Sequence, residues 1–249
     1  MNLLGRVAVV TGATGGIGKE IVKRLDSEGV TLLLISRKGT ELQELLNSLK
    51  NKESKYYVCD LSNQEETEKI ANEISSKYPK IDILLNSAGV GVYKPIEEAT
   101  LSEFNDSLNI GLTSTFILTK KLMSSLNNSQ DSLVLNIGSG AGTIPMAGRS
   151  LYCTTKFALR GLTLSLAEEF KRIGNPKFCL ITLGSTLTSF GPMDFEEKKL
   201  EMEKGKAYFT PEWVADKLTE IIKDPNREVE YQLFPGDYGF GEWNKPEPL

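Results

Sequence analysis

Tyr152 and Lys156 are the two residues whose types and spacing most directly indicate acid–base chemistry. They stand four positions apart in an amphipathic segment, so a helix would place both side chains on one face. A free phenol has a pKa near 10, too high for ready proton exchange at neutral pH. An ammonium group about 4–5 Å away favours the tyrosinate by roughly 3–4 kcal/mol at an effective dielectric constant of ~20. The pair therefore predicts a tyrosine whose pKa is lowered by roughly 2–3 units and which exchanges protons with a substrate.

A glycine-rich segment, Thr11–Gly18, lies between the first apolar run and the first amphipathic stretch. Glycines at 12, 16 and 18 permit a tight turn, let backbone N–H groups approach a pyrophosphate, and let a helix pack close to a strand. The helix N-terminus would offer a partial positive charge of about half a unit to that anion. The segment predicts a dinucleotide-binding loop, with a purely structural turn as the alternative.

The spacing Gly12-x-x-x-Gly16-x-Gly18 is similar to the fingerprint of the short-chain dehydrogenase/reductase family. The resemblance extends to Ser139, thirteen residues before Tyr152, and to Asn109. It implies that Tyr152 protonates a carbonyl oxygen as hydride arrives from a nicotinamide, while Lys156 holds the ribose hydroxyls. It further implies that Ser139 orients the substrate oxygen and that Asn109 distorts its helix and binds a relay water. In reverse, the same residues would oxidise a secondary alcohol.

Ser36 and Arg37 follow the second apolar run, where the adenosine ribose of a dinucleotide would lie. NAD-binding proteins of this architecture usually place a carboxylate there, which would repel a 2′-phosphate. A hydroxyl followed by a guanidinium can instead bind that phosphate through charge-assisted hydrogen bonds. The two residues favour NADP(H), with Lys38 as a weaker contributor. The alternatives are that Arg37 lies on a solvated loop, or that the chain is an NAD-linked alcohol dehydrogenase.

Short motifs that follow the later predicted strands also resemble motifs of the family. The resemblance implies that Asp60 binds the adenine amino group, although Asp60 could equally cap the next helix. Segment 86–89 resembles the family's Asn-Asn-Ala-Gly with Ser87 in the second place, and Leu183 replaces the proline of Pro-Gly-x-x-x-Thr. The expected cofactor-binding residues are Gly12, Thr14, Gly15, Gly16, Ile17, Gly18, Ser36, Arg37, Asp60, Leu61, Asn86, Ala88, Gly89, Tyr152, Lys156, Gly184 and Thr188.

The substrate pocket is expected beyond the nicotinamide site. Segment 184–209 follows a strand and is expected to form a lid, the alternative being a surface excursion. The expected lining is apolar, without Arg or Lys, which favours a small hydrophobic ketone or aldehyde. The expected pocket residues are Val92, Tyr93, Thr143, Met146, Phe190 and Met193.

Short apolar runs alternate with amphipathic stretches along the whole chain. The predicted strands are Val7–Val10, Thr31–Ile35, Tyr56–Cys59, Ile81–Leu85, Leu133–Ile137, Phe178–Leu183 and Val229–Phe234, and the predicted helices are 16–28, 40–50, 63–77, 101–126, 150–172 and 211–222. This alternation predicts an α/β fold with a doubly wound parallel sheet of about seven strands and helices on both faces. Because no linker interrupts the pattern, residues 1–249 are expected to form a single Rossmann-like domain.

Composition narrows the function further. The net charge of −4 and the interspersed charges argue against nucleic-acid or membrane partners. The chain has no histidine and no paired cysteines, so neither Ser-His-Asp catalysis nor a metal site is expected. Three widely spaced cysteines and the lack of a signal-peptide pattern favour the cytoplasm. The family resemblance also implies homodimers or homotetramers. The other class of function weighed is an idle nucleotide-sensing or scaffold protein, which the presence of Ser139, Tyr152 and Lys156 disfavours.

Overall fold

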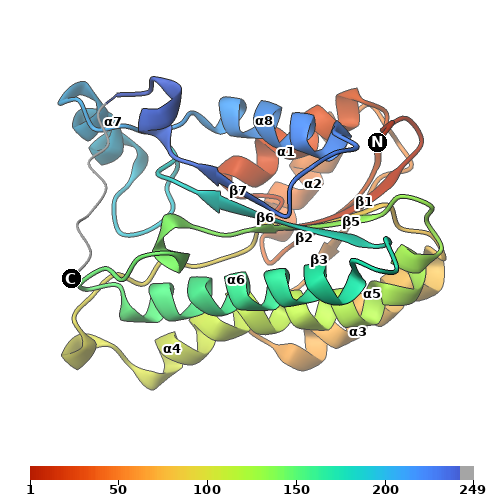
Figure 1. Ribbon diagram of the computed structural model, residues 1–249, viewed down its shortest axis with the longest axis horizontal. Helices are drawn as coiled ribbons and strands as arrows, with labels where there is room; N and C mark the ends of the chain where they lie inside the picture. Colours follow the sequence, from red (N-terminus) through yellow and green to blue (C-terminus); the bar gives the residue numbers. More distant parts are fainter. Residues whose placement is uncertain (242–249) are drawn as a thin grey trace.

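Seven parallel strands form one sheet in the order β3-β2-β1-β4-β5-β6-β7 (Figure 1). The structure is a computed structural model and describes residues 1–241. Its strands are β1 (Val7–Thr11), β2 (Thr31–Ser36), β3 (Lys55–Val58), β4 (Ile83–Asn86), β5 (Leu133–Ile137), β6 (Lys177–Leu183) and β7 (Glu230–Leu233). Its main helices are α1 (Gly16–Ser27), α2 (Gly39–Ser48), α3 (Gln64–Lys77), α4 (Leu101–Leu108), α5 (Ser114–Asn127), α6 (Ser150–Phe170), α7 (Phe195–Glu203) and α8 (Pro211–Lys223).

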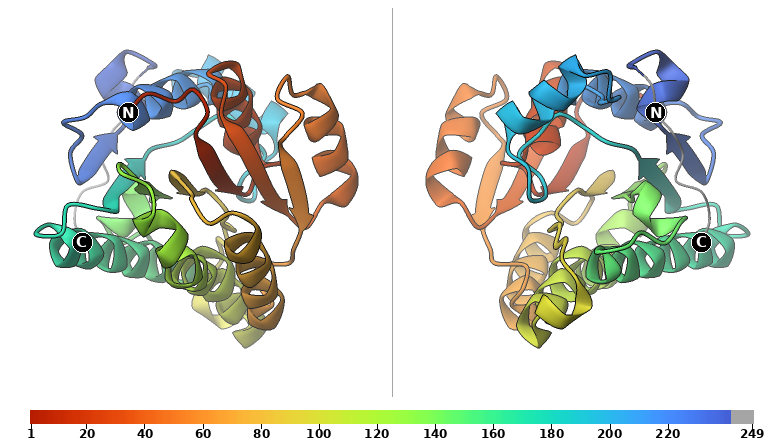
Figure 2. Two further views of the ribbon diagram at one scale, coloured as in Figure 1. Left: turned by 90° about the vertical axis from the view of Figure 1, so that its right-hand side faces the viewer. Right: turned by 90° about the vertical axis from the view of Figure 1, so that its left-hand side faces the viewer.

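The central strands are mostly apolar and almost completely buried because helices cover both faces of the sheet. Helices α1, α2 and α8 pack on one face, and α3 to α6 pack on the other (Figures 1 and 2). Successive residues of β2 alternate between the two cores: Leu32 and Leu34 belong to the first, Leu33 and Ile35 to the second. The predicted doubly wound α/β fold is confirmed.

The strand order reverses between β1 and β4, which are neighbours in the sheet although β2 and β3 lie between them in the chain. The loops after these two strands turn to opposite faces, and such a switch point is where open α/β sheets bind ligands. Thr11, the last residue of β1, accepts hydrogen bonds at Oγ1 from the backbone N–H groups of Ser87 (3.1 Å) and Ala88 (3.2 Å). These hydrogen bonds hold the loops after β1 and β4 in a fixed position relative to each other.

Two predicted segments differ in detail from the structure. The single helix expected over 101–126 is α4 and α5 joined by a π-helical turn at Asn109–Thr113, so the distortion implied at Asn109 is present. Segment 184–209 contains the unexpected helix α7, and Thr186 forms a parallel bridge with Phe209 that folds the segment back on itself. Within residues 1–241, none of the helices combines the length and apolarity that crossing a bilayer requires. Residues 242–249, part of the predicted domain range, lie outside the described residues.

Candidate active site

A cleft with a volume of about 410 Å³ opens where the strands of the sheet end. It brings together residues from the glycine loop, from β2, from the loops after β4 and β5, from α6 and from segment 184–209. The predicted site residues that line it are Gly12, Gly15, Gly16, Ile17, Gly18, Ser36, Arg37, Asp60, Leu61, Ala88, Gly89, Tyr93, Ser139, Met146, Tyr152, Lys156, Gly184, Thr188, Phe190 and Met193.

The glycine loop presents backbone rather than side chains to the cleft. Gly12 has φ +65°, and a Cβ there would lie 3.0 Å from the Ala88 backbone, so the close approach of the two loops requires glycine. Gly15 precedes α1 without a side-chain cap, and the first turn of α1 carries no acidic residue. The first N–H groups of α1 therefore face the cleft free for an anion, as a dinucleotide pyrophosphate requires.

A hydroxyl pair and an unpaired cation mark the end of β2. Ser36 Oγ lies 2.7 Å from Thr14 Oγ1, and this buried contact ties β2 to the glycine loop. Arg37 is exposed at the rim and forms no ion pair within residues 1–241, whereas Lys38 pairs with Glu41 at 2.8 Å. Arg37 is thus the cation that remains available to a phosphate at this end.

Of the predicted residues at the ends of β3 and β4, some line the cleft and others are buried in the sheet. Asp60 lines the cleft, and its Oδ1 accepts from the backbone N–H and hydroxyl of Ser62. The capping alternative for Asp60 is wrong, because the side chain of Asn63 caps α3 by accepting from the Glu66 N–H. Asn86 points instead into the sheet, where its Nδ2 donates to Asn136 at 2.8 Å.

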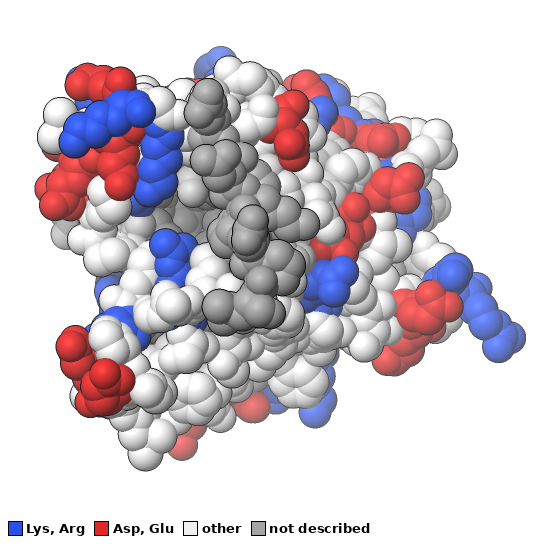
Figure 3. Space-filling view, turned by 60° about the vertical axis from the view of Figure 1, so that its left-hand side comes forward, with Lys and Arg blue, Asp and Glu red and all other residues white. Residues whose placement is uncertain are grey.

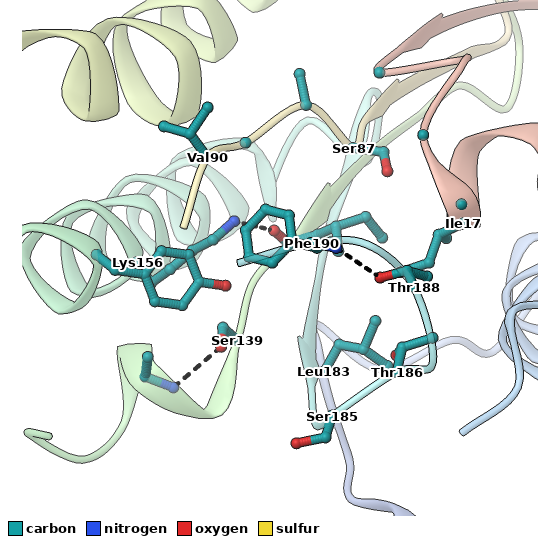
Figure 4. Close-up of a pocket in the computed structure, with 18 of the residues that line it drawn as sticks. Ile17, Ser87, Val90, Ser139, Lys156, Leu183, Ser185, Thr186, Thr188 and Phe190 are labelled. Carbon is teal, nitrogen blue, oxygen red and sulfur yellow. Dashed lines mark hydrogen bonds between the residues drawn. The ribbon is translucent and has the colours of Figure 1, made fainter. Parts of the chain in front are cut away.

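Tyr152, Lys156 and Ser139 all line the cleft, and Figure 4 shows Lys156 and Ser139 near one another. Tyr152 and Lys156 are almost completely buried, and the Lys156 Nζ donates to the Ile137 carbonyl at 2.8 Å. The Lys156 ammonium lies 5.8 Å from the centre of the Tyr152 ring. Ser139 Oγ accepts from the Ala141 N–H, which fixes its side chain beside the cleft. The arrangement places a phenol, an ammonium and a hydroxyl around one small volume.

Burial governs the acid–base properties of this group. Desolvation raises the pKa of Tyr152, and the nearby Tyr93 raises it further, whereas the Ser139 hydroxyl and Arg149 lower it. Desolvation also lowers the pKa of Lys156 to about 8. The sequence predicted that Lys156 would depress the pKa of Tyr152, and this expectation is wrong. Burial of the phenol raises the pKa of Tyr152, and the Lys156 ammonium is directed at the Ile137 carbonyl.

Close helix packing sets the position of α6. A Cβ at Gly111, in the π-helical turn, would lie 2.5 Å from Thr155 Cγ2, so glycine lets α6 approach this turn. Ser107 Oγ and Thr155 Oγ1 lie 2.9 Å apart and reinforce the same contact. Asn109 does not line the cleft, and its Oδ1 accepts from Gln64 Nε2 at 3.0 Å. Its implied role in a proton relay stays a prediction.

Segment 184–209 covers part of the cleft. The Phe190 ring lies 5.7 Å from the Tyr152 ring and packs on Gly91, and its backbone N–H donates to Thr188 Oγ1 (Figure 4). Lys198 of α7 is buried, and its Nζ donates to the carbonyls of Thr188 (2.7 Å) and Phe190 (2.5 Å). Burial lowers the pKa of Lys198. Helix α7 therefore holds the covering residues in place through a buried cation.

The expectation of a pocket without Arg or Lys is wrong. Arg149, Lys198 and Lys206 all line the cleft. The reason is tertiary: the bridge between Thr186 and Phe209 returns the chain to the cleft. Over the face that carries α7, positive and negative side chains are interspersed (Figure 3). The cations in the cleft are thus a local feature and not part of a broad basic surface.

Some predicted residues lie outside the cleft, and others were not predicted. Those outside it are Thr14, Asn86, Val92, Asn109 and Thr143. The unpredicted lining residues are Cys59, Ser87, Val90, Ile110, Ile137, Gly138, Gly140, Ala141, Arg149, Leu183, Ser185, Thr186, Pro192, Lys198, Lys206, Tyr208 and Phe234. Most of these adjoin a predicted motif, and Arg149 stands three positions before Tyr152, a helical spacing that could have revealed it.

Comparisons with known proteins agree with this geometry. A tropinone reductase homolog of Arabidopsis thaliana is 33% identical over 204 residues, covering 79% of this chain and 76% of the relative. A 3-oxoacyl-[acyl-carrier-protein] reductase of Rickettsia felis is 28% identical over 232 residues, covering 90% and 92%. Among solved structures, an alcohol dehydrogenase of the archaeon Thermococcus sibiricus complexed with 5-hydroxy-NADP superposes with a TM-score of 0.81 at 25% identity. That superposition covers 96% of this chain and 99% of the archaeal one.

The family assignment rests on a family model that matches more than half of the chain. The family model described as short chain dehydrogenase matches residues 6–198, which include the glycine loop, the Tyr152 group and the beginning of the lid segment. The resemblance drawn from the motifs is therefore confirmed. This chain belongs to the short-chain dehydrogenase family of oxidoreductases.

Proposed function

We propose that this protein is an NADP(H)-dependent oxidoreductase that interconverts a carbonyl group and a secondary alcohol, with Tyr152 as the acid–base residue. One observation carries the proposal: Tyr152, Lys156 and Ser139 share a cleft with the N-terminus of α1 and with Arg37, which forms no ion pair within residues 1–241. The cleft fits a nicotinamide dinucleotide, because it offers N–H groups for the pyrophosphate and a cation for a 2′-phosphate.

The cofactor would be held along the carboxyl edge of the sheet. The N–H groups of the glycine loop would bind its pyrophosphate, Arg37 its 2′-phosphate, and Lys156 its nicotinamide ribose. Thr188 and Gly184 stand where the family motif contacts the nicotinamide carboxamide. When bound, the nicotinamide supplies or accepts the hydride.

The residues of the chain handle the proton. In reduction, the Tyr152 hydroxyl donates its proton to the carbonyl oxygen, and in oxidation the tyrosinate takes it back. The Ser139 hydroxyl donates a hydrogen bond to the same oxygen and orients it. Burial raises the pKa of Tyr152, so the hydroxyl is protonated and can act as the proton donor in reduction. The Phe190 ring beside Tyr152 excludes water from the reacting atoms.

The test follows the loss of NADPH or NADH absorbance with a panel of aldehydes, ketones and diketones. In the reverse direction, it follows the formation of NADPH or NADH from NADP⁺ or NAD⁺ with secondary alcohols. We expect turnover with NADPH and a carbonyl compound, and slower turnover with NADH. A protein that binds NADPH but turns over none of the panel would support the nucleotide-sensing alternative instead.

We further propose that the protein forms homodimers or homotetramers through α5 and α6. Phe116 on α5 is 48% exposed and Phe157 on α6 is 43% exposed, so apolar rings lie at the surface of both helices. Light scattering of the purified protein measures this assembly state. The three cysteines are free thiols, which fits the cytoplasmic location that the sequence favours.

A further inference from the structure

Five cationic side chains line the cleft, and they differ in whether the protein already neutralises or binds them. The three lysines each contact a protein oxygen: Lys156 the Ile137 carbonyl, Lys198 the Thr188 and Phe190 carbonyls, and Lys206 the Glu201 carboxylate at 2.6 Å. Arg37 and Arg149 have no oxygen partner within the described part of the chain. Arg37 stands at the adenosine end, so Arg149 is a second, separate candidate for an anion.

Arg149 lies at the substrate end of the cleft. It is the residue at the N-terminal boundary of α6, three positions before Tyr152. Its guanidinium carbon lies 4.4 Å from the centre of the Tyr93 ring, and the Tyr93 ring meets the Tyr152 ring edge-on at 5.3 Å. One aromatic ring therefore separates the guanidinium from the phenol that donates the proton.

The stacking leaves the hydrogen-bonding edge of Arg149 free. The N–H groups of a guanidinium point outward in its own plane, so a contact between its carbon and an aromatic face leaves them able to reach a planar acceptor. Within residues 1–241, the one acceptor that these groups meet is Met146 Sδ, 3.4 Å from Nη1, and a thioether is a weak acceptor. Arg149 is also partly buried, so water satisfies it less fully than it satisfies an exposed arginine. A carboxylate can accept two parallel hydrogen bonds from the guanidinium N–H groups of Arg149.

We propose that Arg149 binds the carboxylate of an oxo acid whose carbonyl group faces Tyr152. The proposal rests on the proposed oxidoreductase function and names its substrate class. Met146 contacts Arg149, Phe190 contacts Tyr152, and Met193 also lines the cleft, so a hydrocarbon spacer between the two polar groups would contact apolar side chains. The carbonyl carbon gains the hydride and its oxygen gains the Tyr152 proton, while the carboxylate is unchanged.

The experiment compares oxo acids with their methyl esters, which keep the shape and remove the charge. The probes are levulinate and its two next longer homologues, each assayed with NADPH as acid and as ester. We expect the acid of the fitting length to have a kcat/KM about 30-fold above that of its ester, since charge-assisted hydrogen bonds are lost with the ester. Arg149→Met should abolish this preference mainly by raising KM for the acid. Arg149→Lys should retain part of it, because the charge remains without the planar fork.

Two controls separate the role of Arg149 from general effects. Arg172→Met removes an exposed positive charge beyond the other end of α6 and should keep the acid preference. NADPH binding, followed by fluorescence, should be equal in all variants and reports that the cleft is folded. Equal turnover of acid and ester by the unmodified protein, an unchanged preference in Arg149→Met, or reduction of neutral ketones without any of the oxo acids would overturn the proposal. Absence of turnover with every carbonyl compound would instead refute the oxidoreductase function itself.

Discussion

The two ends of the cleft are built by different means. At the cofactor end, the glycine loop and the N-terminus of α1 present backbone groups that come from one short stretch of chain. At the substrate end, Tyr93, Arg149 and Phe190 present side chains from three segments that are far apart in sequence. Backbone geometry fixes the first end, and side-chain packing fixes the second.

This difference explains which changes each end tolerates. A side chain at Gly12 would collide with the Ala88 backbone, and one at Gly18 would lie 2.1 Å from the Gly12 carbonyl oxygen. Substitution of either glycine would therefore disrupt the conformation of the glycine loop at the cofactor end. The rings and the guanidinium at the substrate end contact each other through flexible side chains, so substitutions there change what is bound more readily than they change the fold.

Tyr152 stands where the two ends meet, and its substitution should have the largest effect. Tyr152→Phe removes the proton donor but keeps the ring that packs on Tyr93 and Phe190. We expect kcat to fall by about 10³-fold, with NADPH affinity nearly unchanged, because acid–base catalysis is worth roughly that much. Steady-state kinetics and a fluorescence titration of NADPH measure the two quantities. Retained activity would refute the assigned role of Tyr152.

The cofactor end can be altered alone. Ser36→Asp with Arg37→Leu places a carboxylate where a 2′-phosphate would lie and removes the unpaired cation. We expect the NADPH-to-NADH ratio of kcat/KM to fall by about 100-fold and the preference to reverse, because two charge-dependent contributions change together.

Lys38→Leu is the matched control for this variant. Its ammonium already pairs with Glu41 at 2.8 Å, so its loss should change the ratio far less. A cofactor preference that stays unchanged in the double variant would contradict the assignment of NADP(H).

Burial of Lys156 should lower the free energy of unfolding of the protein. Its pKa is near 10.5 in the unfolded chain and about 8 in the folded protein. Between these values the unfolded chain binds more protons, so the free energy of unfolding rises with pH, and below about pH 8 the full desolvation cost is present. Lys156→Met should therefore stabilise the cofactor-free protein at pH 7 by about 2 kcal/mol, with the gain disappearing toward about pH 10.5.

Urea denaturation of both proteins at several pH values measures this difference, in which the other titrating groups cancel. A Lys156→Met protein that is less stable than the parent at pH 7 would contradict the prediction. Loss of turnover in the same variant would separate the catalytic use of Lys156 from its effect on stability.

The sequence by itself determined the fold and the local motifs. Alternating apolar runs and amphipathic stretches predicted the seven parallel strands because the strands are buried on both faces. The glycine loop, Ser36-Arg37 and the Tyr152–Lys156 pair were all identified from spacing, since each of them is a short contiguous segment. Leu183, which stands in place of the family proline, is the last residue of β6.

The tertiary structure alone decided the pKa shifts of Tyr152 and Lys156 and the lining of the substrate end of the cleft. Whether Lys156 lowers the pKa of Tyr152 depends on how much water burial removes, and spacing carries no information on burial. Lys198 and Lys206 reach the cleft because segment 184–209 folds back through one bridge, and Arg149 meets Tyr93 although the two stand 56 positions apart in the sequence. Contacts between side chains from separate segments form only when the sheet and its helices have packed, and they decide which substrate the proposed chemistry would act on.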